Sequence, residues 1–194
     1  NTQMEKTIDL EGLWAKYSSL FKRAFGDTNE VNNFLDKFGE RIVVCPAAHK
    51  VDQKYCEPGG LMKQSVDIAI AMKKIAESLS LDVEPASLLR VALGHDLGKI
   101  GSKDSDYYLT QDSDWHREKL GAHYKFNEAT PRMPITHMSL HLLSSSGITL
   151  SLDETRAITT SHGIARDENK AYGYINTPLQ SIVQSARLLT IQTK

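Results

Sequence analysis

The chain has 194 residues, of which 40% are hydrophobic and 24% are charged, so it has enough apolar side chains for the core of one soluble domain. The 23 Lys and Arg residues nearly balance the 24 Asp and Glu residues, and the net charge of −1 gives no electrostatic argument for binding nucleic acid or a membrane surface. There is no signal-peptide pattern and no apolar run near the roughly 18 residues of a membrane span. Two cysteines, Cys45 and Cys56, are too few for a disulfide framework, so we expect a cytoplasmic protein with reduced thiols.

Apolar residues at helical spacing predict two helices near the start of the chain. The first is expected over residues 9–25, where aromatic and leucine side chains recur on one face. The second follows a cap at Asp27 or Thr28 and is expected to end at Gly39. Residues 1–42 are therefore predicted to form a helical extension that packs on the core of the domain.

Two apolar helices are predicted in the centre of the chain, after an irregular segment at residues 40–55. A Pro-Gly-Gly turn precedes the first, which is expected over residues 61–79. Pro85 suits the first turn of the second helix, because its missing N–H needs no partner there. The apolar run of this second helix ends at His95 and Asp96.

The polar and aromatic segment at residues 103–127 predicts a short β-hairpin. Residues 107–109 and 124–126 are expected to pair as strands, with a helical turn at residues 115–120 between them. This hairpin is the only β-structure that the pattern indicates.

Three further helices are expected in the last third of the chain. One covers residues 135–145, and a second begins at a capping box in residues 151–154 and reaches His162. The last begins at a Thr-Pro pair and covers residues 177–189. With no internal repeat and no linker, residues 1–194 are predicted to form a single all-α domain.

The end of the second central helix is the strongest candidate for a functional site. Placing His95 and Asp96 at the end of an apolar helix costs desolvation free energy unless they contact a cation, a partner or water. The pair is therefore a candidate metal-binding or catalytic element. The alternative is a helix whose last polar residues are solvated before a cap at Gly98.

Residues 93–99, Leu-Gly-His-Asp-Leu-Gly-Lys, resemble the signature of the HD-domain superfamily, the all-helical metal-dependent phosphohydrolases. Residues 57–66, Glu-Pro-Gly-Gly-Leu-Met-Lys-Gln-Ser-Val, are similar to the entry into the first core helix of that superfamily. Residues 114–127 are similar to a segment of its phage-encoded members. The resemblance implies an HD-domain helical bundle with its core in residues 43–194.

The same resemblance implies a divalent metal, held by a His on the first core helix, the His-Asp pair and an Asp on a late helix. In this sequence the pair is His95 and Asp96, but Gln64 and Arg187 stand at the positions of the other two ligands. An amide oxygen is a weak ligand, and a guanidinium is permanently cationic and cannot bind a metal. We therefore expect an impaired metal site, in which Arg187 pairs with the Asp96 carboxylate through paired hydrogen bonds.

Other histidines offer a rearranged metal site. By the resemblance, His162 matches a second-metal ligand of some branches, and His137 matches a histidine that precedes the corresponding helix. His141 lies four residues after His137, on the same helix face, and is an alternative to it. Four nitrogen and oxygen ligands for Mn, Ni, Zn or Mg would then come from His95, Asp96, His137 and His162.

Three functions are compatible with these residues. The preferred one is an HD-domain phosphohydrolase homologue with an impaired metal site and weak or no hydrolysis, in which Gln64, Arg187 and His141 contact a phosphate-containing ligand. The second is an active metal-dependent phosphohydrolase that acts on a nucleotide or phosphodiester, with Asp96 and Lys99 in catalytic roles. The third is a non-catalytic binding or accessory protein that needs no cofactor. The sequence does not indicate a particular protein partner.

Overall fold

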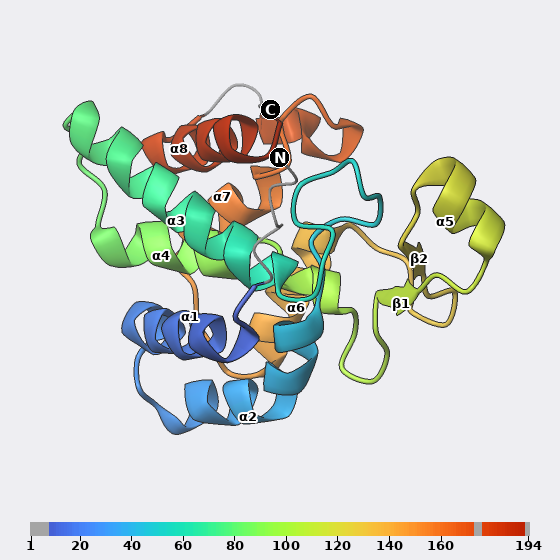
Figure 1. Ribbon diagram of the computed structural model, residues 1–194. Coiled ribbons are helices and arrows are strands. Elements are labelled where there is room, and N and C mark those ends of the chain that lie inside the picture. The colour runs from blue at the N-terminus through green and yellow to red at the C-terminus, as the bar shows by residue number, and fades with distance from the viewer. Residues whose placement is uncertain (1–7, 173–175, 193–194) are drawn as a thin grey trace.

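Helices α3 (Gly60–Ser78) and α4 (Pro85–Gly94) lie at the centre of the computed structural model, which describes residues 8–172 and 176–192 (Figure 1). On one side of this pair lie α1 (Leu10–Phe25) and α2 (Asn29–Val44). On the other side lie α7 (Leu152–Thr160) and α8 (Pro178–Arg187). Helix α6 (Ile135–Ser145) contacts α4, α7 and the 3-10 turn Leu97–Ile100.

The predicted all-α fold with a short hairpin is confirmed. Strands β1 (Tyr108–Thr110) and β2 (Tyr124–Phe126) are antiparallel, with Tyr108 opposite Phe126. Helix α5 (Asp114–Leu120) connects them, and the hairpin and α5 together project away from the helices (Figure 1). The first strand begins one residue later than the sequence predicted.

Local capping signals account for several helix ends. The side chains of Asp9 and Thr28 accept hydrogen bonds from the first turns of α1 and α2. Ser151 and Glu154 form both bonds of the predicted capping box at the start of α7. Thr177 begins α8 with a second complete capping box, and a π-helical turn, Leu188–Gln192, continues from the end of α8.

The prediction that the second helix ends at Gly39 is wrong, because α2 continues to Val44. A Cβ atom at Gly39 would lie 3.0 Å from the ring of Trp14, so this glycine makes room for a side chain of α1 rather than ending the helix. Ile42, which is fully buried, extends the apolar face of α2 beyond it. The segment that was expected to be irregular therefore begins five residues later.

Two clusters of buried apolar side chains form the core. The first joins α1 and α2 to α3, α4 and α6, and it includes Tyr17, Phe21 and Phe34. The second joins α3 and α4 to α7 and α8. Helix α4 contributes Leu93 to the first cluster and Ala92 to the second, so the turn that follows it begins where both clusters meet.

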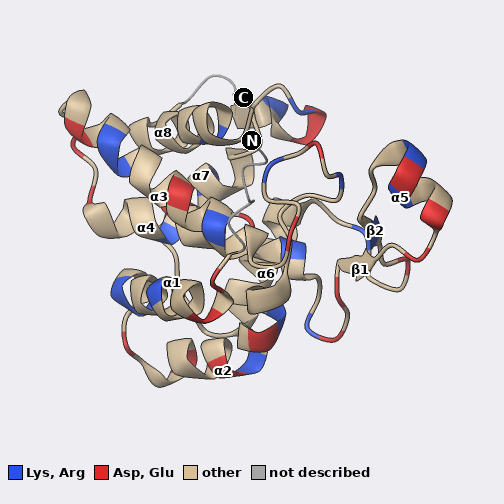
Figure 2. Cartoon of the chain, in the orientation of Figure 1, with Lys and Arg blue, Asp and Glu red and all other residues tan. Residues whose placement is uncertain are grey.

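The surface elements carry charges of both signs. Figure 2 shows Lys and Arg residues next to Asp and Glu residues along α2, α3 and α5. Within the described residues, no helix combines the length and the hydrophobicity that crossing a membrane requires.

Candidate functional site

The predicted His95-Asp96 pair lies in a turn that α6 covers. Both side chains are completely buried, so the alternative of a solvated helix end is wrong. A Cβ atom at Gly98 would lie 2.2 Å from the carbonyl oxygen of Ile135, and the glycine is what allows α6 to approach this closely. The Ser139 hydroxyl accepts a hydrogen bond from the Gly98 N–H at 2.7 Å and donates one to the His95 carbonyl at 2.8 Å.

The two ring nitrogens of His95 have different roles. Nδ1 lies 3.0 Å from the carbonyl oxygen of Val91 and 2.8 Å from that of Ala92, so Nδ1 carries the proton. Nε2 then has a free lone pair, which accepts a hydrogen bond from Arg187 Nη1 at 2.7 Å. Burial lowers the pKa of His95 to about 3, although the Asp96 carboxylate opposes this shift, and the ring is neutral at pH 7.

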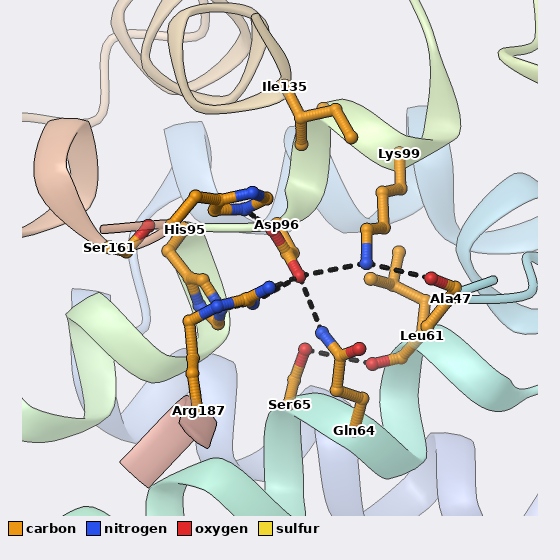
Figure 3. A network of polar contacts seen from close by, with 12 residues as sticks. Ala47, Leu61, Gln64, Ser65, His95, Asp96, Lys99, Ile135, Ser161 and Arg187 are labelled. Atoms are coloured by element: carbon orange, nitrogen blue, oxygen red, sulfur yellow. Dashed lines mark hydrogen bonds and ion pairs between the residues drawn. The ribbon is translucent and has the colours of Figure 1, made fainter. Parts of the chain in front are cut away.

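Four side chains surround the Asp96 carboxylate (Figure 3). Oδ2 accepts hydrogen bonds from Gln64 Nε2 at 2.5 Å and from Arg187 Nη1 at 2.7 Å. The ammonium group of Lys99 lies 3.1 Å from the same oxygen. Oδ1 lies 2.7 Å from His162 Nε2. The carboxylate therefore has hydrogen-bond donors on both oxygens.

This group of side chains contains two cations and one anion. Burial alone would raise the pKa of Asp96, but the charges of Arg187 and Lys99 outweigh it and hold that pKa well below its ordinary value. Burial lowers the pKa of Lys99, while its contacts with Asp96 and with the Ala47 carbonyl at 2.8 Å favour the charged form. Burial also lowers the pKa of His162, so a neutral ring donates to Asp96. Two basic side chains therefore contact a single buried carboxylate.

The contact between Arg187 and Asp96 that the sequence predicted is present. It differs from the prediction in one respect, because a single nitrogen, Nη1, faces both Asp96 and His95 in place of paired hydrogen bonds. Lys99 was predicted to have a catalytic role, and its contact with Asp96 was not predicted. The signal was the spacing of three residues between Asp96 and Lys99, which a helical turn brings to one side.

The donor set does not fit the metal that the resemblance implies. His95 Nε2 and Asp96 Oδ2, the atoms that would bind it, both accept hydrogen bonds from Arg187. A metal ion bound there would also lie close to the positive charges of Arg187 and Lys99, which repel it in a buried site. Among the described residues, no group of three His, Cys, Asp or Glu side chains is arranged to hold a metal ion. A guanidinium occupies the place where the resemblance implies a metal.

Helix α6 places the other two predicted histidines apart from these contacts. His137 is half-buried, and His141 is exposed. Neither has a hydrogen bond or ion pair with Asp96 in the part of the chain that the structure describes. The structure thus brings His162 into contact with Asp96 and leaves His137 and His141 outside that contact.

No protein-family model matches the chain, and comparison with curated proteins and with solved structures found no significant match. The HD-domain resemblance of residues 57–66 and 93–99 stays a prediction.

Proposed function

We propose that this chain is an HD-domain homologue in which the Arg187 guanidinium takes the place of the metal, and that it does not catalyse metal-dependent phosphoester hydrolysis. One observation carries the proposal: Arg187 Nη1 lies 2.7 Å from His95 Nε2 and 2.7 Å from Asp96 Oδ2. In a metallohydrolase these atom types bind the cation that activates a water molecule. A guanidinium satisfies both acceptors but has no coordination position for water.

The protonation states of the site support the same proposal. A general base works best when its pKa lies near the operating pH, whereas the pKa of Asp96 is held well below its ordinary value. The Lys99 ammonium contacts Asp96 and the Ala47 carbonyl, so its proton is held by acceptors of the protein itself. These contacts favour a non-catalytic binding role over the active phosphohydrolase, which would require Arg187 to leave both of its acceptors.

Metal content is the direct test. Elemental analysis of the purified protein, before and after incubation with Mn²⁺, Ni²⁺ and Zn²⁺, is expected to find no stoichiometric metal, and a generic phosphodiester is expected to stay intact. A stoichiometric metal in the parent protein, or hydrolysis that chelation abolishes, would contradict the proposal.

A pair of variants tests the assigned positions. The double variant Gln64→His with Arg187→Asp supplies the two missing ligands and is expected to bind about one metal ion per chain. The matched control, Arg187→Gln, removes the guanidinium without supplying a carboxylate, and we expect it to bind no metal. If the double variant folds and binds no more metal than the parent, the two positions are assigned wrongly.

A further inference from the structure

An apolar groove lies where α1, α3 and α4 meet at the surface, and its volume is about 210 Å³. Val66 and Ala69 of α3 and Leu88 of α4 line it and are buried, whereas Ile70 beside them is 45% exposed. Sites that enclose a whole small molecule have volumes of about 300–1,000 Å³. The groove is therefore suited to a few apolar side chains of a larger partner.

Helical spacing places an apolar and a basic side chain together on each side of the groove. On α1, Lys16, Leu20 and Arg23 are separated by four and three residues, so they share one face of the helix. On α3, Ile70 and Lys73 are three residues apart and also share a face. Both helices pack on α4, which lies between them (Figure 1). The groove thus has an apolar lining with basic residues on two helices around it.

The positive charge at this groove is local and largely unpaired. The side chains of Lys16 and Arg23 are exposed and have no hydrogen bond or ion pair with other described residues. Lys73 lies 3.9 Å from Glu77, but both side chains are more than half exposed, so this ion pair contributes little. None of the described residues that line the groove is acidic, although the whole chain has a net charge of −1.

We propose that this groove docks an acidic amphipathic helix of a protein partner. Such helices place apolar side chains at positions i, i+3, i+4 and i+7 into an apolar groove. Acidic residues beside these anchors would face Lys16, Arg23 and Lys73, and this charge complementarity favours an acidic partner over a basic one. Lys16 and Arg23 lie about 10 Å apart along the axis of α1, so the single carboxylate of an acyl chain would contact only one of them.

Titration of the methyl-labelled protein with a designed peptide, followed by NMR, tests the inference. The probe is a helix of about 15 residues built from Ala, Leu and Glu, with leucines at i, i+3, i+4 and i+7 and glutamates on both sides of them. We expect the methyl signals of Leu20, Val66 and Leu88 to shift. The same peptide with lysine in place of every glutamate is expected to bind about tenfold more weakly, because it repels the basic side chains.

Substitutions of exposed residues test the two parts of the groove without disturbing the core. Lys16→Gln is expected to weaken binding of the acidic peptide by about threefold, since it removes one exposed charge contact. Ile70→Ser is expected to weaken it by about tenfold, because an apolar contact is lost. Lys22→Gln is the matched control: it removes an exposed lysine of the same helix that does not line the groove, and we expect no change.

Several results would overturn the inference. One is that the acidic peptide leaves the groove methyl signals unchanged at about 1 mM, and another is that the lysine peptide binds as well. Equal effects of Lys22→Gln and Lys16→Gln would also overturn it. Methyl shifts on dilution of the protein alone would assign the groove to a second copy, and tighter binding of decanoate or of phosphatidylglycerol vesicles would assign it to a lipid.

The inference goes beyond the proposed function and is independent of it. Gln64, His162 and Arg187, which contact Asp96, do not line this groove. A failure of peptide binding would therefore leave the metal-free site unaffected, and a metal at Asp96 would leave the groove unaffected.

Discussion

Two buried carboxylates of this protein, Asp96 and Glu154, are surrounded in different ways. Glu154 is 1% exposed, and its Oε2 accepts hydrogen bonds from Ser87 Oγ at 2.7 Å and from Arg90 Nη1 at 3.1 Å. Its Oε1 accepts one from the Ser151 N–H at 2.8 Å. A single cation, which reaches solvent, balances this carboxylate.

Asp96 has two cations in place of one. Arg187 and Lys99 both contact Oδ2, and their side chains are 15% and 8% exposed. A buried ion pair is costly because both charges lose their hydration, and an additional buried cation adds to that cost. Glu154 thus has one basic partner that reaches solvent, whereas Asp96 has two that are nearly buried.

The largest difference between the two carboxylates is expected when each is neutralised. Asp96→Asn leaves Arg187 and Lys99 buried without an anion, and we expect the free energy of unfolding to fall by about 3–5 kcal/mol. Glu154→Gln is expected to cost about 1–2 kcal/mol, because Arg90 is 32% exposed and can be hydrated. Urea denaturation followed by circular dichroism measures both. Equal losses in the free energy of unfolding would contradict the expected difference between the basic side chains around the two carboxylates.

Removing one basic side chain from each site is expected to lower the free energy of unfolding more at Glu154 than at Asp96. Lys99→Met leaves Asp96 paired with Arg187, so we expect a loss of at most about 1 kcal/mol, from the Ala47 carbonyl that loses its donor. Arg90→Met leaves Glu154 without a cation and is expected to cost about 2–3 kcal/mol, although Arg90 is the more exposed of the two. The same denaturation experiment applies. A greater loss from Lys99→Met would mean that Asp96 needs both cations.

Acid should destabilise the Asp96 site through His95. Its folded pKa is about 3, below the value of about 6.5 expected in the unfolded chain, so the unfolded chain binds more protons between these values. The stabilisation is therefore complete above pH 6.5 and is lost as the pH falls towards 3. Between pH 7 and pH 5 we expect a loss of about 2 kcal/mol from this residue. Denaturation at both pH values measures it, with His141→Gln as the exposed control. A stability that does not change over this range would show that His95 is not held neutral by the fold.

Much of the secondary structure could be predicted because its signals are local. The helix over residues 135–145 and the capping box at Ser151 lie where the sequence placed them. The prediction at Gly39 was wrong because the sequence alone does not distinguish a glycine that ends a helix from one that makes room for an aromatic ring of another helix.

The sequence by itself determined the capping box at Ser151 and the adjacency of His95 and Asp96, and the HD-domain resemblance drew attention to Gln64 and Arg187. It also led to the contact between Arg187 and Asp96, which are 91 residues apart. Only the tertiary structure decided that His162, and not His137, contacts Asp96. The physical reason is that periodicity and capping act within a few residues. Periodicity and capping indicate which side chains share one face of a helix. Packing between helices decides which side chains from distant parts of the chain lie against that face.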